Sequence, residues 1–254
     1  MNKMGIHLNL ELTDHCNLKC KMCSQSMREE AHNTPMSFMS WSSWKSIIDG
    51  LASFEEEVAI SPHWLGEPTL HPEFDRFVTY AFEQNKSGGY FSDFKLHTNA
   101  VIFSRERASL LLKLANPQKG PSRFRFIHFS IDAYSKESYL KVKGIDRAEL
   151  VYKNILEFLK LRNKLGLTYP YACLGFVVQP ENVHEGRSFL EYWKTILQMY
   201  GRTPHICGDW PDKEQDAIYF RPLNTKDQEA SNLLHSDLLS SLSVPSAPRR
   251  DGSF

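Results

Sequence analysis

The sequence predicts an α/β protein built on a parallel β-sheet. Short apolar segments typical of strands alternate with longer segments that have the apolar spacing of helices. Such alternation favours parallel strands joined by right-handed crossovers. About six strand–helix units could close part of the way round a barrel or form an open doubly wound sheet, and polar residues gather where the strands end.

Six segments are expected to form strands. Apolar and polar residues alternate within them, or apolar residues form a short run. They are residues 6–13, 57–61, 94–98, 125–132, 171–178 and 217–220. Since the carboxyl ends of parallel strands lie at one edge of a sheet, the residues that follow these strands should meet there.

The segments between these strands have helical periodicity. Ser37 or Ser40 could cap the first helix, because a serine hydroxyl accepts a hydrogen bond from a backbone N–H of the first turn. Expected helices cover residues 36–54, 72–82, 105–114, 135–142, 148–165, 188–200 and 227–242. The last residues, 244–254, are rich in Pro, Ser and Arg and are expected to be disordered.

Three cysteines, Cys16, Cys20 and Cys23, lie on the loop that follows the first strand. Three close thiolates can hold a soft metal or an iron–sulfur cluster. A cluster of four irons needs four ligands, so three cysteines leave one iron open to a ligand that is not protein. This vacancy is the main indication of function.

Zinc and a disulfide are alternatives at these cysteines. Zinc needs a fourth ligand in a structural site, which His15, His32 or His63 could supply, but no second Cys or His pair has finger-like spacing. An odd number of neighbouring cysteines disfavours a disulfide, as does an N-terminus without a secretion signal. The cysteine pattern therefore favours a cluster over zinc.

The composition excludes several classes of protein. The 254 residues are 41% hydrophobic and 24% charged, as in ordinary globular proteins. The chain has 30 Lys and Arg residues and 30 Asp and Glu residues, so its formal net charge is zero. A net positive charge that would favour binding to nucleic acid or to an anionic membrane is therefore lacking. No apolar run approaches the roughly 20 residues of a membrane span. We therefore expect a cytoplasmic protein with free thiols.

Polar residues follow each of the next four strands. Gly66-Glu67-Pro68 follows the second strand and Thr98-Asn99 the third. Ser130 and Asp132 end the fourth, and Gln179 and Asn182 follow the fifth. Taken singly, the Gly-Glu-Pro element could be a turn before a helix, and Ser130 and Asp132 could be helix caps. Together they predict a site at one rim of the sheet.

Together, the Cys-x3-Cys-x2-Cys, Gly-Glu-Pro and Ser-x-Asp elements resemble those of radical SAM enzymes, over residues 6 to 225. Gly66–Pro72 and Tyr219–Asn224 are most similar to the SPASM-containing branch. The resemblance implies a partial (β/α)6 TIM-like barrel over residues 1–225, followed by a C-terminal helix over 226–243. It also implies a [4Fe–4S] cluster whose open iron binds S-adenosylmethionine.

The resemblance also implies roles for single residues. Cys16, Cys20 and Cys23 would be the cluster ligands, and the glycine–glutamate–proline element would meet the methionine ammonium. The residues implied to bind S-adenosylmethionine are Met22, Gly66, Glu67, Pro68, Thr98, Asn99, Ser130, Asp132, Lys143 and Val178.

The sequence departs from the usual family pattern at three positions. Met22 replaces an aromatic residue and could still pack on the adenine. Leu65 replaces the first glycine of Gly-Gly-Glu-Pro. Lys143 stands where an arginine often binds the S-adenosylmethionine carboxylate, and a solvated lysine at a helix end is the alternative.

The SPASM branch carries a further domain with auxiliary clusters, bound by cysteines that this chain lacks. Cys173 is expected in the core, and Cys207 is expected to be a surface thiol in a loop. The sequence therefore predicts one cluster and no auxiliary-cluster domain.

The implied activity is reductive cleavage of S-adenosylmethionine to a 5′-deoxyadenosyl radical, which takes a hydrogen atom from a substrate. The SPASM resemblance favours a peptide or protein side chain; a small metabolite such as an amino sugar is the alternative. A low-potential electron donor of the flavodoxin or ferredoxin type is the implied partner. A non-catalytic iron–sulfur or zinc scaffold and a barrel enzyme with catalytic zinc stay open.

Overall fold

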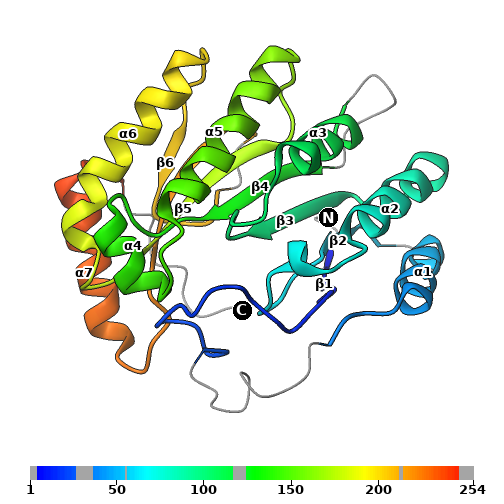
Figure 1. The fold of residues 1–254 in the computed structure, drawn as a ribbon, viewed down its shortest axis with the longest axis horizontal. Helices are drawn as coiled ribbons and strands as arrows, with labels where there is room; N and C mark the ends of the chain where they lie inside the picture. The colour runs from blue at the N-terminus through cyan, green and yellow to red at the C-terminus, as the bar shows by residue number, and fades with distance from the viewer. Residues whose placement is uncertain (1–4, 27–36, 55, 117–123, 212–213, 246–254) are drawn as a thin grey trace.

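The computed structural model describes residues 5–26, 37–54, 56–116, 124–211 and 214–245 (Figure 1). Its centre is one seven-stranded sheet with the strand order β1-β2-β3-β4-β5-β7-β6, in which all neighbours are parallel. The strands are β1 (Ile6–Asn9), β2 (Val58–Ser61), β3 (Asp93–Thr98), β4 (Phe124–Ser130), β5 (Tyr171–Val178), β6 (His205–Cys207) and β7 (Ala217–Pro222).

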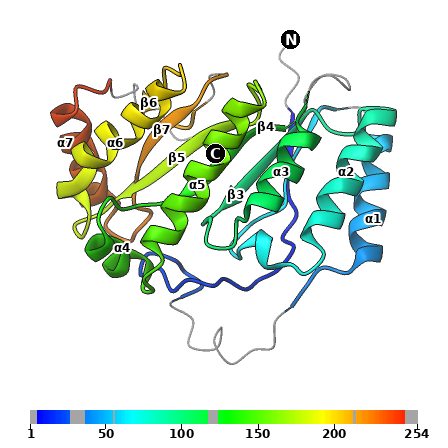
Figure 2. The same cartoon turned by 45° about the horizontal axis from the view of Figure 1, so that its top comes forward.

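Helices cover the outer face of this sheet (Figures 1 and 2). They are α1 (Trp41–Gly50), α2 (Phe74–Gly88), α3 (Arg105–Leu114), α4 (Lys136–Lys143), α5 (Ala148–Lys164), α6 (Gly186–Met199) and α7 (Gln228–Ser241). Short 3-10 helices occupy Leu51–Ser53, Pro68–Leu70 and Val183–Glu185. The helices form an arc, and the sheet curves inside it as a partial barrel.

The two faces of the sheet carry different clusters of side chains. In β5, Leu174 and Phe176 belong to the large core between sheet and helices, whereas Tyr171 and Cys173 belong to a smaller cluster. The rest of the smaller cluster is Phe126, Cys207, Ala217 and Tyr219. Successive side chains of a strand point to opposite faces, so the smaller cluster lies on the concave face.

Several sequence predictions need correction at their edges. β1 ends at Asn9, because Leu10 makes the last backbone hydrogen bond to Ser61 and the chain then leaves the sheet. Residues 37–40 are not helical; α1 begins at Trp41, and the Ser40 hydroxyl caps it by accepting from the Ser43 N–H at 3.1 Å.

The strand β6 was not predicted from the sequence. A strand of three residues is too short to show alternation of apolar and polar residues. It is recognised only by its pairing with β7. Cys207 lies in it and is buried, so the prediction of a surface thiol was wrong. Cys173 is buried in the smaller cluster, which agrees with its predicted place in the core.

A buried ion pair holds together the beginnings of β5 and β7. Arg162 in α5 makes two 2.7 Å hydrogen bonds to the Asp216 carboxylate, just before β7. Arg162 also donates to the Pro170 carbonyl, and Asp216 accepts from the Ala172 N–H. One pair therefore joins α5 to the beginnings of β5 and β7.

Two further points concern the ends of the chain and its helices. Residues 246–254, most of the segment predicted to be a disordered tail, lie outside the described residues. Within the described residues, every helix is too short or too polar to cross a lipid bilayer.

Candidate functional site

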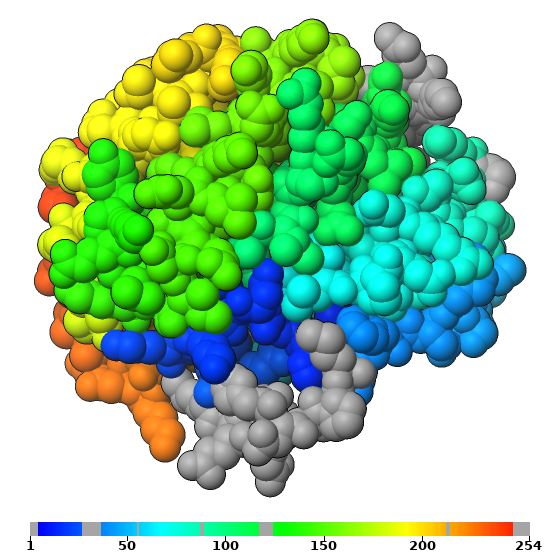
Figure 3. Space-filling view, viewed as in Figure 1, coloured from blue at the N-terminus to red at the C-terminus, as the bar shows by residue number. Residues whose placement is uncertain are grey.

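The loop that carries the cysteines rests on the end of α4. After β1 the chain crosses the carboxyl edge of the sheet towards α4, and on the face drawn in Figure 3 it forms part of the surface beside that helix. The Lys19 N–H donates to the Lys143 carbonyl at 3.0 Å, and the Lys21 N–H to the Val142 carbonyl at 3.1 Å. The last carbonyls of a helix have no partner within it, so the loop satisfies them.

The three cysteines share one pocket. Its lining is His15, Cys16, Leu18, Cys20, Cys23, Gln25 and Ser26. All three thiols are free and half-buried, and the Asn99 side-chain amide donates to the Cys16 sulfur at 3.6 Å. Sulfur ligands that converge in one pocket are the donor set of an iron–sulfur cluster, so these residues fit that group.

The environment of Cys16 and Cys20 favours the protonated form of both thiols. Burial raises the pKa of Cys16 to about 12, and the nearby Glu67 carboxylate adds to the effect. Burial also raises the pKa of Cys20, although Lys143 opposes it. Metal binding must therefore release protons here. Among the described residues, no three His, Cys, Asp or Glu side chains are arranged to hold a single metal ion.

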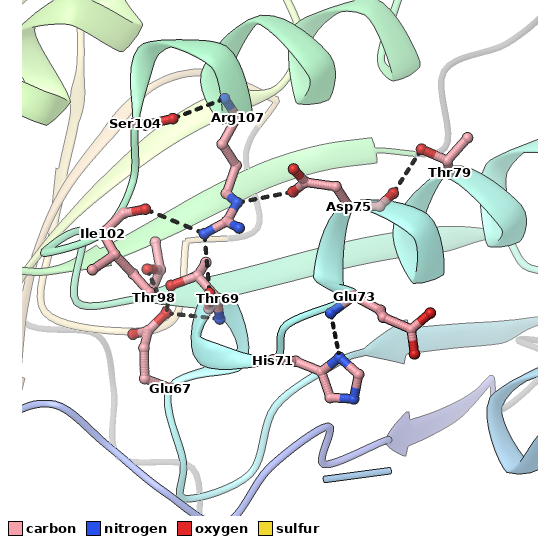
Figure 4. A network of polar contacts seen from close by, with 10 residues as sticks. All are labelled: Glu67, Thr69, His71, Glu73, Asp75, Thr79, Thr98, Ile102, Ser104 and Arg107. Carbon is pink, nitrogen blue, oxygen red and sulfur yellow. Dashed lines mark hydrogen bonds and ion pairs between the residues drawn. The ribbon is translucent and has the colours of Figure 1, made fainter. Parts of the chain in front are cut away.

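Glu67 faces inward rather than towards open space (Figure 4). One carboxylate oxygen accepts from Thr98 at 2.8 Å and from the backbone and side chain of Thr69; the other accepts from the Asn99 N–H at 2.7 Å. Burial raises the pKa of Glu67, and these hydrogen bonds oppose the rise. The carboxylate joins β3 to the Gly-Glu-Pro turn, which leaves the backbone of that turn as the part that can meet a ligand.

Gly66 lies where two segments of backbone touch. A Cβ atom at this position would lie 2.0 Å from the Thr13 carbonyl oxygen and 2.9 Å from that of His15. The Glu67 N–H donates to the His15 carbonyl, and the Glu11 carboxylate accepts from the Gly66 N–H. The turn after β2 is therefore locked to the start of the cysteine loop.

Ser130, Asp132 and Lys143 form one hydrogen-bonded group. The Lys143 ammonium donates to Asp132 at 2.5 Å and to the Ser130 hydroxyl at 3.0 Å, and both charged side chains are 1% exposed. The alternative of a solvated lysine at the helix end was wrong. Burial would raise the pKa of Asp132, but Lys143 and the hydrogen bonds outweigh it and hold that pKa below its usual value.

Met22, in the cysteine loop, lies beside the residue that follows β5. The Gln179 amide lies 3.8 Å from the Met22 sulfur. Asn182 joins the Asp132 and Val177 carbonyls, and the Asp132 carboxylate accepts from the Val177 N–H at 2.7 Å. The residues that follow β4 and β5 are thus held together as predicted for one rim.

Val178 does not lie where the sequence interpretation put it. It is fully buried in the large core with Leu174 and Phe176, on the helix-covered face of β5. Strand alternation puts Val177 on the concave face instead. Val178 therefore cannot face an adenine inside the barrel, and the prediction was one residue out of phase.

Two residues of the site were missed from the sequence. The Glu11 carboxylate accepts from the Leu65 and Gly66 N–H groups at 2.7 and 3.0 Å, and it is the one acidic residue of the segment 6–13, which could have drawn attention to it. Trp210 contacts His97 and His128 from the β6–β7 connection, and nothing in its local sequence indicates this.

Comparison with known proteins agrees with this geometry. Residues 10–192 match the Radical SAM superfamily. The chain is 27% identical over 213 residues to the "Tungsten-containing aldehyde ferredoxin oxidoreductase cofactor-modifying protein" of Pyrococcus furiosus, covering 84% of this chain and 55% of that protein. It is 36% identical over 168 residues to the "S-adenosylmethionine-dependent nucleotide dehydratase" of Selenomonas ruminantium, covering 65% and 51%. The chain spans about half the length of these curated relatives.

A solved structure shares the fold. The structure described as "Native anSMEcpe with bound AdoMet" superposes with a TM-score of 0.57 at 17% sequence identity, over 85% of this chain and 52% of that one. Members of the matched family are enzymes that use a [4Fe–4S] cluster and S-adenosylmethionine. The family match covers well over half of the chain and includes the cysteine loop, so the chain belongs to the radical SAM superfamily.

Proposed function

We propose that Cys16, Cys20 and Cys23 hold a [4Fe–4S] cluster in this chain, and that the rim around them binds S-adenosylmethionine. The observation that carries the proposal is the shared pocket of three free thiols, with the Gly-Glu-Pro turn on one side and the Ser130–Asp132–Lys143 group on the other. Bound together, the two cofactors supply a 5′-deoxyadenosyl radical by reductive cleavage.

The remaining roles follow from the chemistry of each group. Backbone carbonyls of Gly66, Glu67 and Pro68 suit an ammonium, which offers only donors. Lys143 and Ser130 suit the methionine carboxylate, with Asp132 holding the lysine in place. Met22, beside Gln179, suits the apolar face of the adenine. Thr98 and Asn99 position Glu67 and the first cysteine from the end of β3.

The substrate would enter from the concave face and give up a hydrogen atom there. The resemblance to the SPASM branch favours a peptide or protein side chain. A small metabolite is the second candidate, favoured by a relative that is named for nucleotide dehydration. A low-potential donor of the flavodoxin or ferredoxin type would supply the electron. We expect residues 1–225 to form the cofactor-binding unit and the protein to work in the cytoplasm.

Anaerobic cluster reconstitution tests the proposal. Iron, sulfide and 5′-deoxyadenosine are measured after dithionite and S-adenosylmethionine are added, with Cys20→Ala as the control. We expect about four irons per chain, and nucleoside that disappears in the variant. Bound zinc in place of iron would overturn the proposal. A full cluster without 5′-deoxyadenosine, even when peptide or metabolite extracts are added, would favour the non-catalytic scaffold.

A further inference from the structure

Three histidines gather on the concave face, below the rim. His63 follows β2, and its ring stacks on that of His97 with centroids 5.2 Å apart; His97 lies 5.0 Å from His128. His97 alternates in β3 with the core residue Leu96, and His128 alternates in β4 with the core residue Phe129, so both imidazoles point away from the helices. The three rings thus come from three neighbouring segments of the sheet.

The neighbouring strand leaves room for these rings. A Cβ atom at Gly175 would lie 2.5 Å from His128 Nε2, so the glycine in β5 lets the imidazole lie against the sheet. Trp210 stacks on His97 at 5.7 Å and is 41% exposed. The three histidines are partly exposed themselves, which means that they face a space that solvent can enter rather than packed core.

Charged side chains also face this space. Strand alternation places Arg221 on the same face of β7 as Tyr219, and it is exposed. Among the described residues it has no carboxylate within ion-pair distance. Two carboxylates nearby are engaged: Asp93 pairs with Lys95 and Arg125, and Asp132 pairs with Lys143. Arg221 is therefore available to an incoming anion.

The imidazoles add no charge of their own at neutral pH. Burial lowers the pKa of His63 to about 4. Burial also lowers the pKa of His128, to about 3. The Asp132 carboxylate opposes this second shift, whereas Arg221, His63 and Lys143 add to it. Burial lowers the pKa of His97 too, assisted by His128, His63, His7 and Lys95. An anion among these rings would act in the opposite direction and favour their protonation. Asp209 also lies near this space, close to Tyr219, and its carboxylate opposes the charge of Arg221 there.

We propose that the concave face holds the substrate by an anionic group, a phosphate or a carboxylate, bound by Arg221 and the His63–His97–His128 group. Arg221 supplies a fixed charge with a fork of donors, and the imidazoles supply further donors as they take up protons. That the bound molecule is the substrate rests on the proposed function. The anion site itself follows from these side chains.

Calorimetric titration with sulfate tests the site, since sulfate is a dianion that does not itself titrate near neutral pH. The reconstituted protein is titrated with S-adenosylmethionine present, so that Lys143 is already occupied, at fixed ionic strength and in two buffers of different ionisation enthalpy. We expect saturable binding with net proton uptake, and affinity that rises about tenfold between about pH 8 and about pH 6. Parallel titrations with methyl phosphate and acetate distinguish a phosphate site from a carboxylate site.

Matched variants separate the anion site from general charge effects. Arg221→Gln should weaken sulfate binding by about tenfold or more, and Arg147→Gln, an exposed arginine at the start of α5, should leave it unchanged. His97→Gln and His128→Gln should reduce the proton uptake, and the exposed His184→Gln should not. Since Arg221 is exposed, its substitution tests the site even if a histidine variant fails to fold.

Two outcomes would overturn the inference. One is the absence of saturable binding of all three anions; the other is binding that Arg221→Gln leaves intact or that proceeds without proton uptake. Cluster content and 5′-deoxyadenosine are measured on the same preparation. An active preparation that binds no anion overturns only this inference, whereas a preparation that binds anions but holds no cluster overturns only the proposed function.

Discussion

Gly66 occupies a position where no side chain fits. Its missing Cβ would lie 2.0 Å from the Thr13 carbonyl oxygen, and backbone cannot move aside as the end of a flexible side chain can. We predict that Gly66→Ala costs about 1–3 kcal/mol of unfolding free energy and lowers the iron content per chain. Urea unfolding and iron assay measure the two effects.

Gly50 provides the control for Gly66. It is the last residue of α1, and a Cβ atom there would have no neighbouring atom within 4 Å. Gly50→Ala should therefore keep stability and iron content unchanged or gain about 1 kcal/mol from helix propensity. Equal behaviour of the two variants would contradict a specific role for the Gly66 contact.

Asp132 has two separate tasks, one conformational and one electrostatic. Its φ of +62° is left-handed, a conformation that Asn shares readily, and its carboxylate is the buried partner of Lys143. Asp132→Asn therefore removes the charge while it keeps the backbone. Because an uncompensated buried ammonium remains, we predict a loss of about 3–5 kcal/mol in urea unfolding.

Two further variants test this explanation. Asp132→Asn combined with Lys143→Met should recover most of the loss, since no unpaired charge is left. Asp146→Asn breaks the exposed ion pair with Lys136 and should cost no more than about 1 kcal/mol. If the double variant is no more stable than Asp132→Asn alone, the ion pair is not what Asp132 contributes.

At the scale of the element, α4 links the cysteine loop to the barrel. Gly144 caps this helix with φ +73°, and a Cβ there would lie 2.4 Å from the Lys19 carbonyl oxygen. Gly89 caps α2 with a similar φ of +66°, but no atom lies within 4 Å. The two glycines share the conformation and differ only in the contact with the loop.

We therefore predict different outcomes for the two Gly→Ala changes. Both should lose about 1–2 kcal/mol from the left-handed conformation. Only Gly144→Ala should also displace the loop and lower the iron content and the yield of 5′-deoxyadenosine. Iron assay after reconstitution, together with thermal unfolding, checks the comparison. Iron content that is normal in both variants would mean that the loop holds its shape without α4.

At the scale of the whole molecule, local patterns revealed most of the strands and the cysteines. Cys16, Cys20 and Cys23 are neighbours in sequence, and β5 has the bounds that its apolar run predicts. Contacts between distant segments were not visible in this way. The Asp132–Lys143 ion pair depends on the direction of α4. Trp210 reaches His97 only because β6 pairs with β7 as the edge strand of the sheet. Val178 was misplaced because one residue of phase in a strand reverses its face.

The histidines of the concave face also make the stability of the whole fold depend on pH. The pKa values of His63 and His128 are about 4 and about 3 in the folded protein, below the value of about 6.5 expected when unfolded. As pH falls below about 6.5, the unfolded chain binds protons that the folded chain does not, so the folded state loses stability.

We predict a loss of about 1–2 kcal/mol for each of these histidines between about pH 8 and about pH 5, measured by urea unfolding at each pH. His128→Gln cannot take up the proton in either state, so its stability should fall less steeply with acid, whereas the exposed His184→Gln should retain the parent slope. Parallel slopes for His128→Gln and the parent would mean that His128 is protonated as readily in the fold as outside it. That result would also reduce the proton uptake expected on anion binding, because an imidazole with an ordinary pKa of about 6.5 is already partly charged near pH 6.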